Sequence, residues 1–87
     1  MRLQANGETI DRLVQQGIVI LQAFNAEYKN DPAGRGAEFQ RGNFTGWRST
    51  IHTVYQDCAE QIVDRVLKQT NLSIPADEIG IAVAGAS

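Results

Sequence analysis

The segment from Glu8 to Lys29 constrains the fold more than any other, because it contains neither proline nor a pair of helix-breaking residues. Its apolar side chains recur at steps of three and four residues, the spacing that places them on one side of an α-helix. The acidic first turn and the basic last turn complement the helix dipole. Asp31-Pro32 predicts the end of the helix, since the residue before proline avoids helical geometry. The pattern therefore predicts an amphipathic helix over about residues 8–30, with an apolar stripe formed by Ile10, Leu13, Val14, Gly17, Leu21, Phe24 and Tyr28.

A second helix is predicted over about residues 47–71, with Asn43 or Thr45 as its N-cap and Pro75 beyond its end. Its basic last turn again suits the helix dipole. One side of this segment carries a stripe made of Trp47, Ile51, Val54, Tyr55, Cys58, Ile62 and Val66.

Residues 31–46 contain four glycines and one proline, and they show no sustained period of two or of three to four. This composition predicts a long loop. Loops of this length are uncommon in compact domains, so three alternatives stay open: a functional loop, a mobile loop, or a short helical turn near residues 37–41. After Pro75, apolar and small residues alternate, which fits a strand, a tail or a linker to a further domain. The expected division is a helical domain over residues 1–74 and a C-terminal segment over 75–87.

Both predicted helices carry apolar residues outside their main stripe. Val19 falls on the polar side of the first helix, and Ala59 and its apolar neighbours drift around the second half of the second helix. A lone hairpin cannot cover these extra faces, whereas pairing two hairpins buries them. We therefore predict an all-α fold, an antiparallel hairpin of two long amphipathic helices that pairs into a four-helix bundle. The expected partner is a second copy or another helical protein, and the predicted interface is Ile18, Val19, Val63, Val66 and Leu67.

Length and charge exclude several classes of protein. A chain of 87 residues forms one domain at most. The formal net charge of −2 argues against broad attraction to phosphate backbones or anionic lipid, so nucleic acid is not an expected partner. A single cysteine allows neither an intramolecular disulfide nor a cysteine-based metal cluster. The N-terminus resembles no signal peptide and no apolar run is long enough to cross a bilayer. We expect a cytoplasmic protein without a cofactor and without membrane contact.

Three groups of side chains are candidates for chemistry. His52 has Arg48, Tyr55 and Gln56 as helical neighbours, so no carboxylate orients its ring. Cys58 lies within the apolar stripe, where a thiol behaves as a small hydrophobe. A carboxylate ridge that could approach a divalent cation is better interpreted as a solvated helix face. The sequence predicts no catalytic residue and no metal ligand, and an enzyme would need a site assembled across subunits around His52 and the ridge of Asp57, Glu60 and Asp64.

The predicted loop interleaves arginine, glycine and aromatic residues, a combination that can stack on unpaired bases. Acidic residues cancel its arginines, and no phosphate-cradling Gly-Lys-Ser/Thr sequence is present. The preferred interpretation is that the loop phenylalanines cover the ends of the hairpin. A single-stranded nucleic-acid binder remains the alternative, with a ligand loop made of Arg35, Phe39, Arg41, Phe44 and Arg48.

The segments Leu13-Val14-Gln15-Gln16-Gly17 and Phe44-Thr45-Gly46-Trp47-Arg48 resemble N-terminal helical regions of some bacterial regulatory and defence proteins. The resemblance covers scattered positions and implies no site residue. It leaves open that the chain is the N-terminal domain of a larger regulatory or defence protein. The preferred function is a non-catalytic self-association or protein-interaction module with a regulatory role.

Overall fold

A computed structural model describes residues 6–72 and 74–79, and all the regular secondary structure in this part of the chain is helical. The prediction of an all-α fold is therefore confirmed in class, although the number and bounds of the helices differ. The elements in chain order are α1 (Gly7–Asn30), α2 (Arg35–Val54), α3 (Ala59–Gln69) and a 3₁₀ turn, η1 (Ala76–Ile79).

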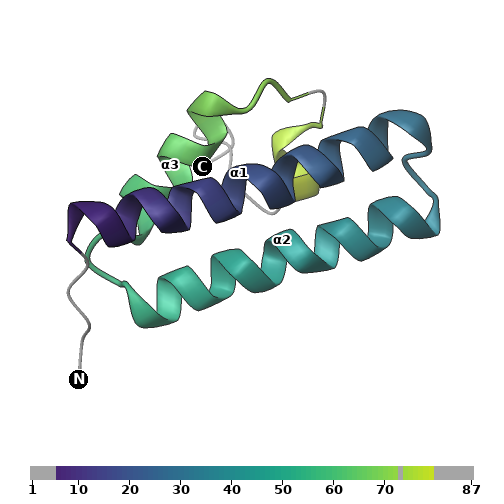
Figure 1. Ribbon diagram of the computed structural model, residues 1–87. Helices are drawn as coiled ribbons and strands as arrows, with labels where there is room; N and C mark the ends of the chain where they lie inside the picture. The colour runs from purple at the N-terminus through teal and green to yellow at the C-terminus, as the bar shows by residue number, and fades with distance from the viewer. Residues whose placement is uncertain (1–5, 73, 80–87) are drawn as a thin grey trace.

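Helix α1 is the centre of the arrangement. It runs antiparallel to α2, and α3 packs along its other side (Figure 1). Helices α2 and α3 touch each other far less than either touches α1, while η1 lies against α2. The described residues thus form a three-helix arrangement with α1 at its centre rather than a two-helix hairpin.

The ends of α1 follow the sequence closely. The Asn6 side chain accepts a hydrogen bond from the backbone N–H of Thr9 at 2.8 Å, which satisfies one of the free donors of the first turn. At the other end Asp31 is extended, as expected before Pro32, and its N–H donates to the carbonyl of Glu27 at 2.9 Å. The prediction of a helix over about 8–30 is confirmed.

Helix α2 begins twelve residues earlier than predicted. The prediction of a long loop over 31–46 is therefore wrong, since most of these residues belong to α2. A tight turn joins α1 to α2, in which the Gly34 N–H donates to the carbonyl of Asp31 at 3.0 Å. Gly34, extended at φ −77° and ψ 164°, is the N-cap, so Asn43 and Thr45 lie inside the helix and cap nothing. The helix forms despite its glycines because it buries a stripe against its neighbours, made of Ala37, Phe44, Trp47 and Ile51.

The predicted second helix over 47–71 is divided into the end of α2 and the whole of α3. Tyr55 leaves helical geometry at φ −118° and ψ 49°, and the Cys58 N–H donates to its carbonyl at 3.0 Å across the turn. Neither proline nor glycine marks this break. The chain reverses here so that Ile62 and Val66 reach α1, where both are fully buried. The gain in burial outweighs the lost helical hydrogen bonds.

At Gly17 all three helices approach one another closely. A Cβ atom placed there would lie 2.5 Å from Cζ2 of Trp47 and 2.7 Å from Cγ2 of Val66. The missing side chain lets α1 contact α2 and α3 at the same level. Around it lies the hydrophobic core, whose fully buried large side chains are Val14, Leu21, Phe24, Phe44, Ile51, Ile62 and Val66.

The segment after α3 folds back onto the helices. The Asn25 amide of α1 donates to the carbonyl of Asn71 at 3.3 Å. On α2, Arg41 pairs with Glu78 at 2.7 Å. Ile79 is buried against the same helix, so the packed unit extends beyond the predicted division at residue 74. The alternation of apolar and small residues that suggested a strand continues into residues 80–87, which lie outside the described residues.

Candidate functional site: a groove between α2 and α3

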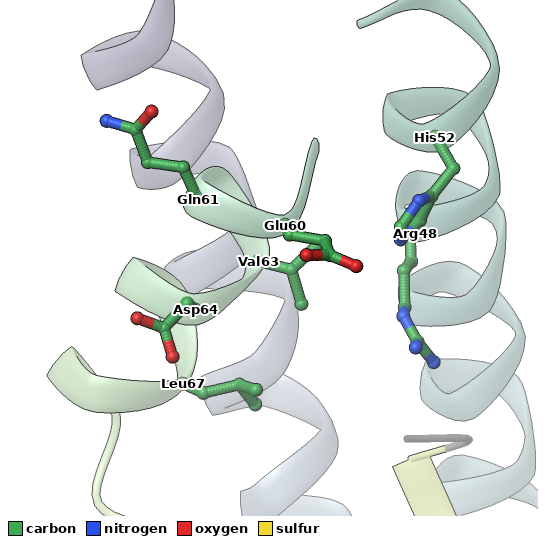
Figure 2. A pocket seen from close by; sticks show the side chains of 7 residues that line it. All are labelled: Arg48, His52, Glu60, Gln61, Val63, Asp64 and Leu67. Carbon is green, nitrogen blue, oxygen red and sulfur yellow. The ribbon is translucent and has the colours of Figure 1, made fainter. Parts of the chain in front are cut away.

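The divergence of α2 and α3 leaves an open groove of about 680 Å³ between them. Its apolar part comes from α3, where Val63 stands at the edge of the core and Leu67 is half-buried. Both side chains lie on the side of α3 that faces α2 (Figure 2). An apolar surface of this kind, bordered by polar groups, suits the binding of a helix.

The two walls of the groove carry opposite charge. Arg48 and His52 stand one helical turn apart on α2, and Glu60 faces them from the first turn of α3 (Figure 2). Arg48 runs along α2 toward η1, where its guanidinium donates to the carbonyl of Ile79 at 3.3 Å. Asp64 turns away from α2 and pairs with Lys68 at 2.9 Å. Arg48 therefore forms the fixed cation of one wall, with His52 beside it, and Glu60 the acid of the other.

The five interface residues predicted from the sequence lie in different parts of the structure. Val66 is 0% exposed and lies beside Gly17 in the core, so it cannot contact a partner. Val63 and Leu67 line the groove, and Ile18 is half-buried against the core. Val19 is 64% exposed, about 200° around α1 from Gly17, and therefore faces away from both α2 and α3. The five residues do not form one surface.

The residues of the predicted ligand loop all lie on α2, and most serve the fold. Phe44 is fully buried but lies in the middle of α2, and Phe39 is 66% exposed, so the interpretation that both cover the ends of the hairpin is not confirmed. The Arg41 guanidinium lies 5.4 Å from the ring centre of Phe24 and also binds Glu78. Arg35 is exposed near Phe39 in a shallow depression on the outer side of α2. The five side chains therefore do not converge on one ligand.

The candidate side chains for chemistry are also dispersed. His52 is exposed on α2, while Cys58 is a half-buried free thiol at the start of α3, packed against the core. Asp57 lies in the turn before α3, apart from the helical positions of Glu60 and Asp64. Within residues 6–72 and 74–79, no group of three or more His, Cys, Asp or Glu side chains is placed to hold a metal ion.

The groove residues were visible in the sequence only as separate features. Arg48 and His52 are four residues apart, as are Glu60 and Asp64, so each pair was expected on one side of a helix. In a single helix over 47–71, both pairs would have belonged to the same helix and could not have faced each other. The turn at residues 55–58 instead sets them across a gap, and no signal in the sequence marks that turn.

No protein-family model matches this sequence, and no curated protein or solved structure is significantly similar to it. Among the described helices, none combines the length and the apolar character needed to cross a bilayer.

Proposed function

We propose that this chain is a non-catalytic helical interaction module that receives a helix of a partner in the groove between α2 and α3. The observation that carries the proposal is the pairing of an apolar floor, Val63 and Leu67, with walls of opposite charge. Apolar area supplies affinity for a docked helix, and charged rims set its orientation.

Binding suits this groove better than catalysis. A catalytic site needs several groups held in converging geometry and largely shielded from water. His52 and Glu60 are exposed on opposite walls, and the thiol of Cys58 packs against the core instead of lining the groove. We therefore propose no reaction.

Recognition of single-stranded nucleic acid is not proposed. Stacking on bases requires accessible aromatic rings beside accessible cations. Of the five residues in the predicted ligand loop, Phe44 is in the core and Arg41 is engaged by Phe24 and Glu78. Arg35 and Phe39 remain accessible, but Glu38 shares their depression and offsets the charge.

The proposal is tested by Leu67→Asp, with Val19→Asp as the matched control on the opposite side of the molecule. We expect the aspartate at 67 to weaken association by about tenfold or more, because a carboxylate must then leave water in the interface. Val19→Asp should leave association unchanged. Sedimentation velocity over a dilution series measures the association, and fluorescence of the apolar-surface dye ANS reports whether the groove is open in the monomer.

Two results together would contradict the proposal: a chain that is monomeric at every concentration, and an ANS signal that Leu67→Asp leaves unchanged. The first would remove self-association, and the second would show that the groove offers no apolar surface to any helix.

A further inference from the structure

We infer that residues 80–87 of this same chain dock along α3 in the groove between α2 and α3, so that a partner helix must displace them. This segment follows η1 and lies outside the described residues. The inference rests on the proposed function for what competes with the segment, whereas docking of the segment itself is measurable without a partner.

The chain leaves η1 at one end of the groove. The turn at residues 55–58 joins α2 to α3 and marks the other end, beside Glu60. Arg48 and Leu67 line the end away from that turn. The Arg48 guanidinium points toward η1 (Figure 2) and donates to the carbonyl of Ile79 at 3.3 Å. The last described residue is thus held by a side chain that lines the groove, and the segment that follows begins there.

The alternation of apolar and small residues in this segment matches the spacing of the groove floor. In an extended chain, residues two apart lie on the same side and about 6.6 Å from each other, so Ile81 and Val83 share one side. Val63 and Leu67 are one helical turn apart, about 6 Å along α3. With the segment running toward the turn, Ile81 meets Leu67 and Val83 meets Val63.

The segment is long enough for this path. Leu67 and Glu60 are separated by about 10 Å along α3, and four extended residues span about 13 Å. Residues 81–84 therefore cover the length of the groove, and only Gly80 connects them to η1. A segment joined by so short a connection has an effective concentration on the order of millimolar at its site, which a separate partner must overcome.

The composition of the segment also suits the groove. Residues 80–87 carry no charged side chain, so neither the basic wall of Arg48 and His52 nor the Glu60 carboxylate repels them. The polar atoms of both walls can exchange hydrogen bonds with the backbone of an extended chain, whose N–H and C=O groups need partners. Apolar side chains of the segment and of the groove floor leave water together, which favours docking.

The other exposed apolar side chains lie on different sides of the molecule. Val19 faces away from both α2 and α3. Phe39 is about 200° around α2 from Arg41, the residue that holds η1 through Glu78. The segment would have to pass around a helix to reach either side chain, whereas the groove begins where η1 ends.

The docked segment is tested by methyl NMR on the whole chain. In wild type we expect nuclear Overhauser cross-peaks between the methyl groups of Val83 and those of Val63 or Leu67. Ile81→Asp should abolish these cross-peaks and shift the Val63 and Leu67 resonances, because a docked aspartate would have to leave water. The Val19 methyl resonances should stay fixed in the same spectra.

Ser87→Asp is the matched control, since it adds the same charge to the same segment. Position 87 lies about 13 Å beyond Val83 in an extended chain, past the end of α3 beside the turn. This variant should keep the cross-peaks and the groove resonances of wild type.

Release of the segment should also strengthen binding of a partner helix. A groove that is open about one tenth of the time binds about tenfold more weakly than one that is always open. Ile81→Asp should therefore tighten by about tenfold the association that Leu67→Asp weakens, and it should raise ANS fluorescence. Sedimentation velocity and the dye measure the two effects.

Missing Val83 cross-peaks, together with groove resonances that Ile81→Asp leaves unchanged, would overturn the docked segment, and Leu67→Asp would still decide the proposed function. Cross-peaks without any gain in association for Ile81→Asp would overturn the competition. If the ANS signal of the Ile81→Asp chain is then also insensitive to Leu67→Asp, the proposed function fails as well.

Discussion

Gly17 shows how one residue sets the distance between three helices. Its hydrogen atom faces the six-membered ring of Trp47 on one side and Val66 on the other. Both neighbours are buried and belong to different helices, so neither can withdraw from an added methyl group without moving a helix. The glycine is therefore required by packing and not by backbone conformation.

We expect Gly17→Ala to destabilise the protein by about 1–2 kcal/mol. Overpacking a close contact typically costs about 1–3 kcal/mol, and the better helix propensity of alanine returns up to about 1 kcal/mol of that. Urea unfolding followed by the fluorescence of Trp47, the only tryptophan, measures the change.

Gly42→Ala is the matched control for this substitution. A Cβ at Gly42 meets no atom within 4 Å, so alanine there should stabilise α2 by about 0.5–1 kcal/mol. Equal effects of the two substitutions would contradict the tight contact assigned to Gly17.

At the scale of elements, η1 is held to α2 by a small polar cluster. Arg41 binds Glu78 at 2.7 Å and lies over Phe24, while Arg48 reaches the carbonyl of Ile79. The side chains of Arg41 and Glu78 are 34% and 38% exposed, so water weakens the ion pair without removing it. These contacts attach the end of the described chain to α2 beside Ile79.

A double-mutant cycle on Arg41→Ala and Glu78→Ala should give a coupling energy of about 0.5–1 kcal/mol. Arg41→Ala should cost more than Glu78→Ala, because it also removes the contact between the guanidinium and the ring of Phe24. Chemical denaturation of the four proteins provides the cycle. Purely additive effects would mean that the ion pair does not hold η1 in place.

The same elements show where sequence patterns failed. In α2 the buried positions 37, 44, 47 and 51 do follow helical spacing, but Arg41 fills the place of an apolar residue between them. Together with the glycines, this concealed the periodicity, because the apolar stem of an arginine is not counted as hydrophobic. The long loop predicted there is a helix for that reason.

At the scale of the whole molecule, the three helices complete a core within a single chain. Phe24, Phe44 and Ile62, one from each helix, are all essentially inaccessible to water without a partner. Several of the extra apolar positions that suggested obligate pairing are instead buried when α3 packs against α1, as Val66 shows. Association through the groove is thus expected to join folded chains rather than to cause folding.

Helicity should accordingly stay constant when the protein is diluted through dissociation. Circular dichroism on the same dilution series used for sedimentation measures this. A loss of helicity in step with dissociation would contradict a self-sufficient core and would indicate that folding and association are coupled.

The helical class, the bounds of α1 and the end of α1 at Asp31 could be predicted from the amino-acid sequence, because these depend on local periodicity and on Asp31-Pro32. Val63 and Leu67 were also predicted as interface residues, a role that stays a prediction until association is measured. The start of α2, the turn at residues 55–58 and the groove could be recognised only in three dimensions. Those features arise because Phe44, Ile62 and Val66 are buried around α1, and this burial stabilises the fold by more than the glycines in α2 and the break between α2 and α3 destabilise it. That balance depends on contacts between residues far apart in the chain.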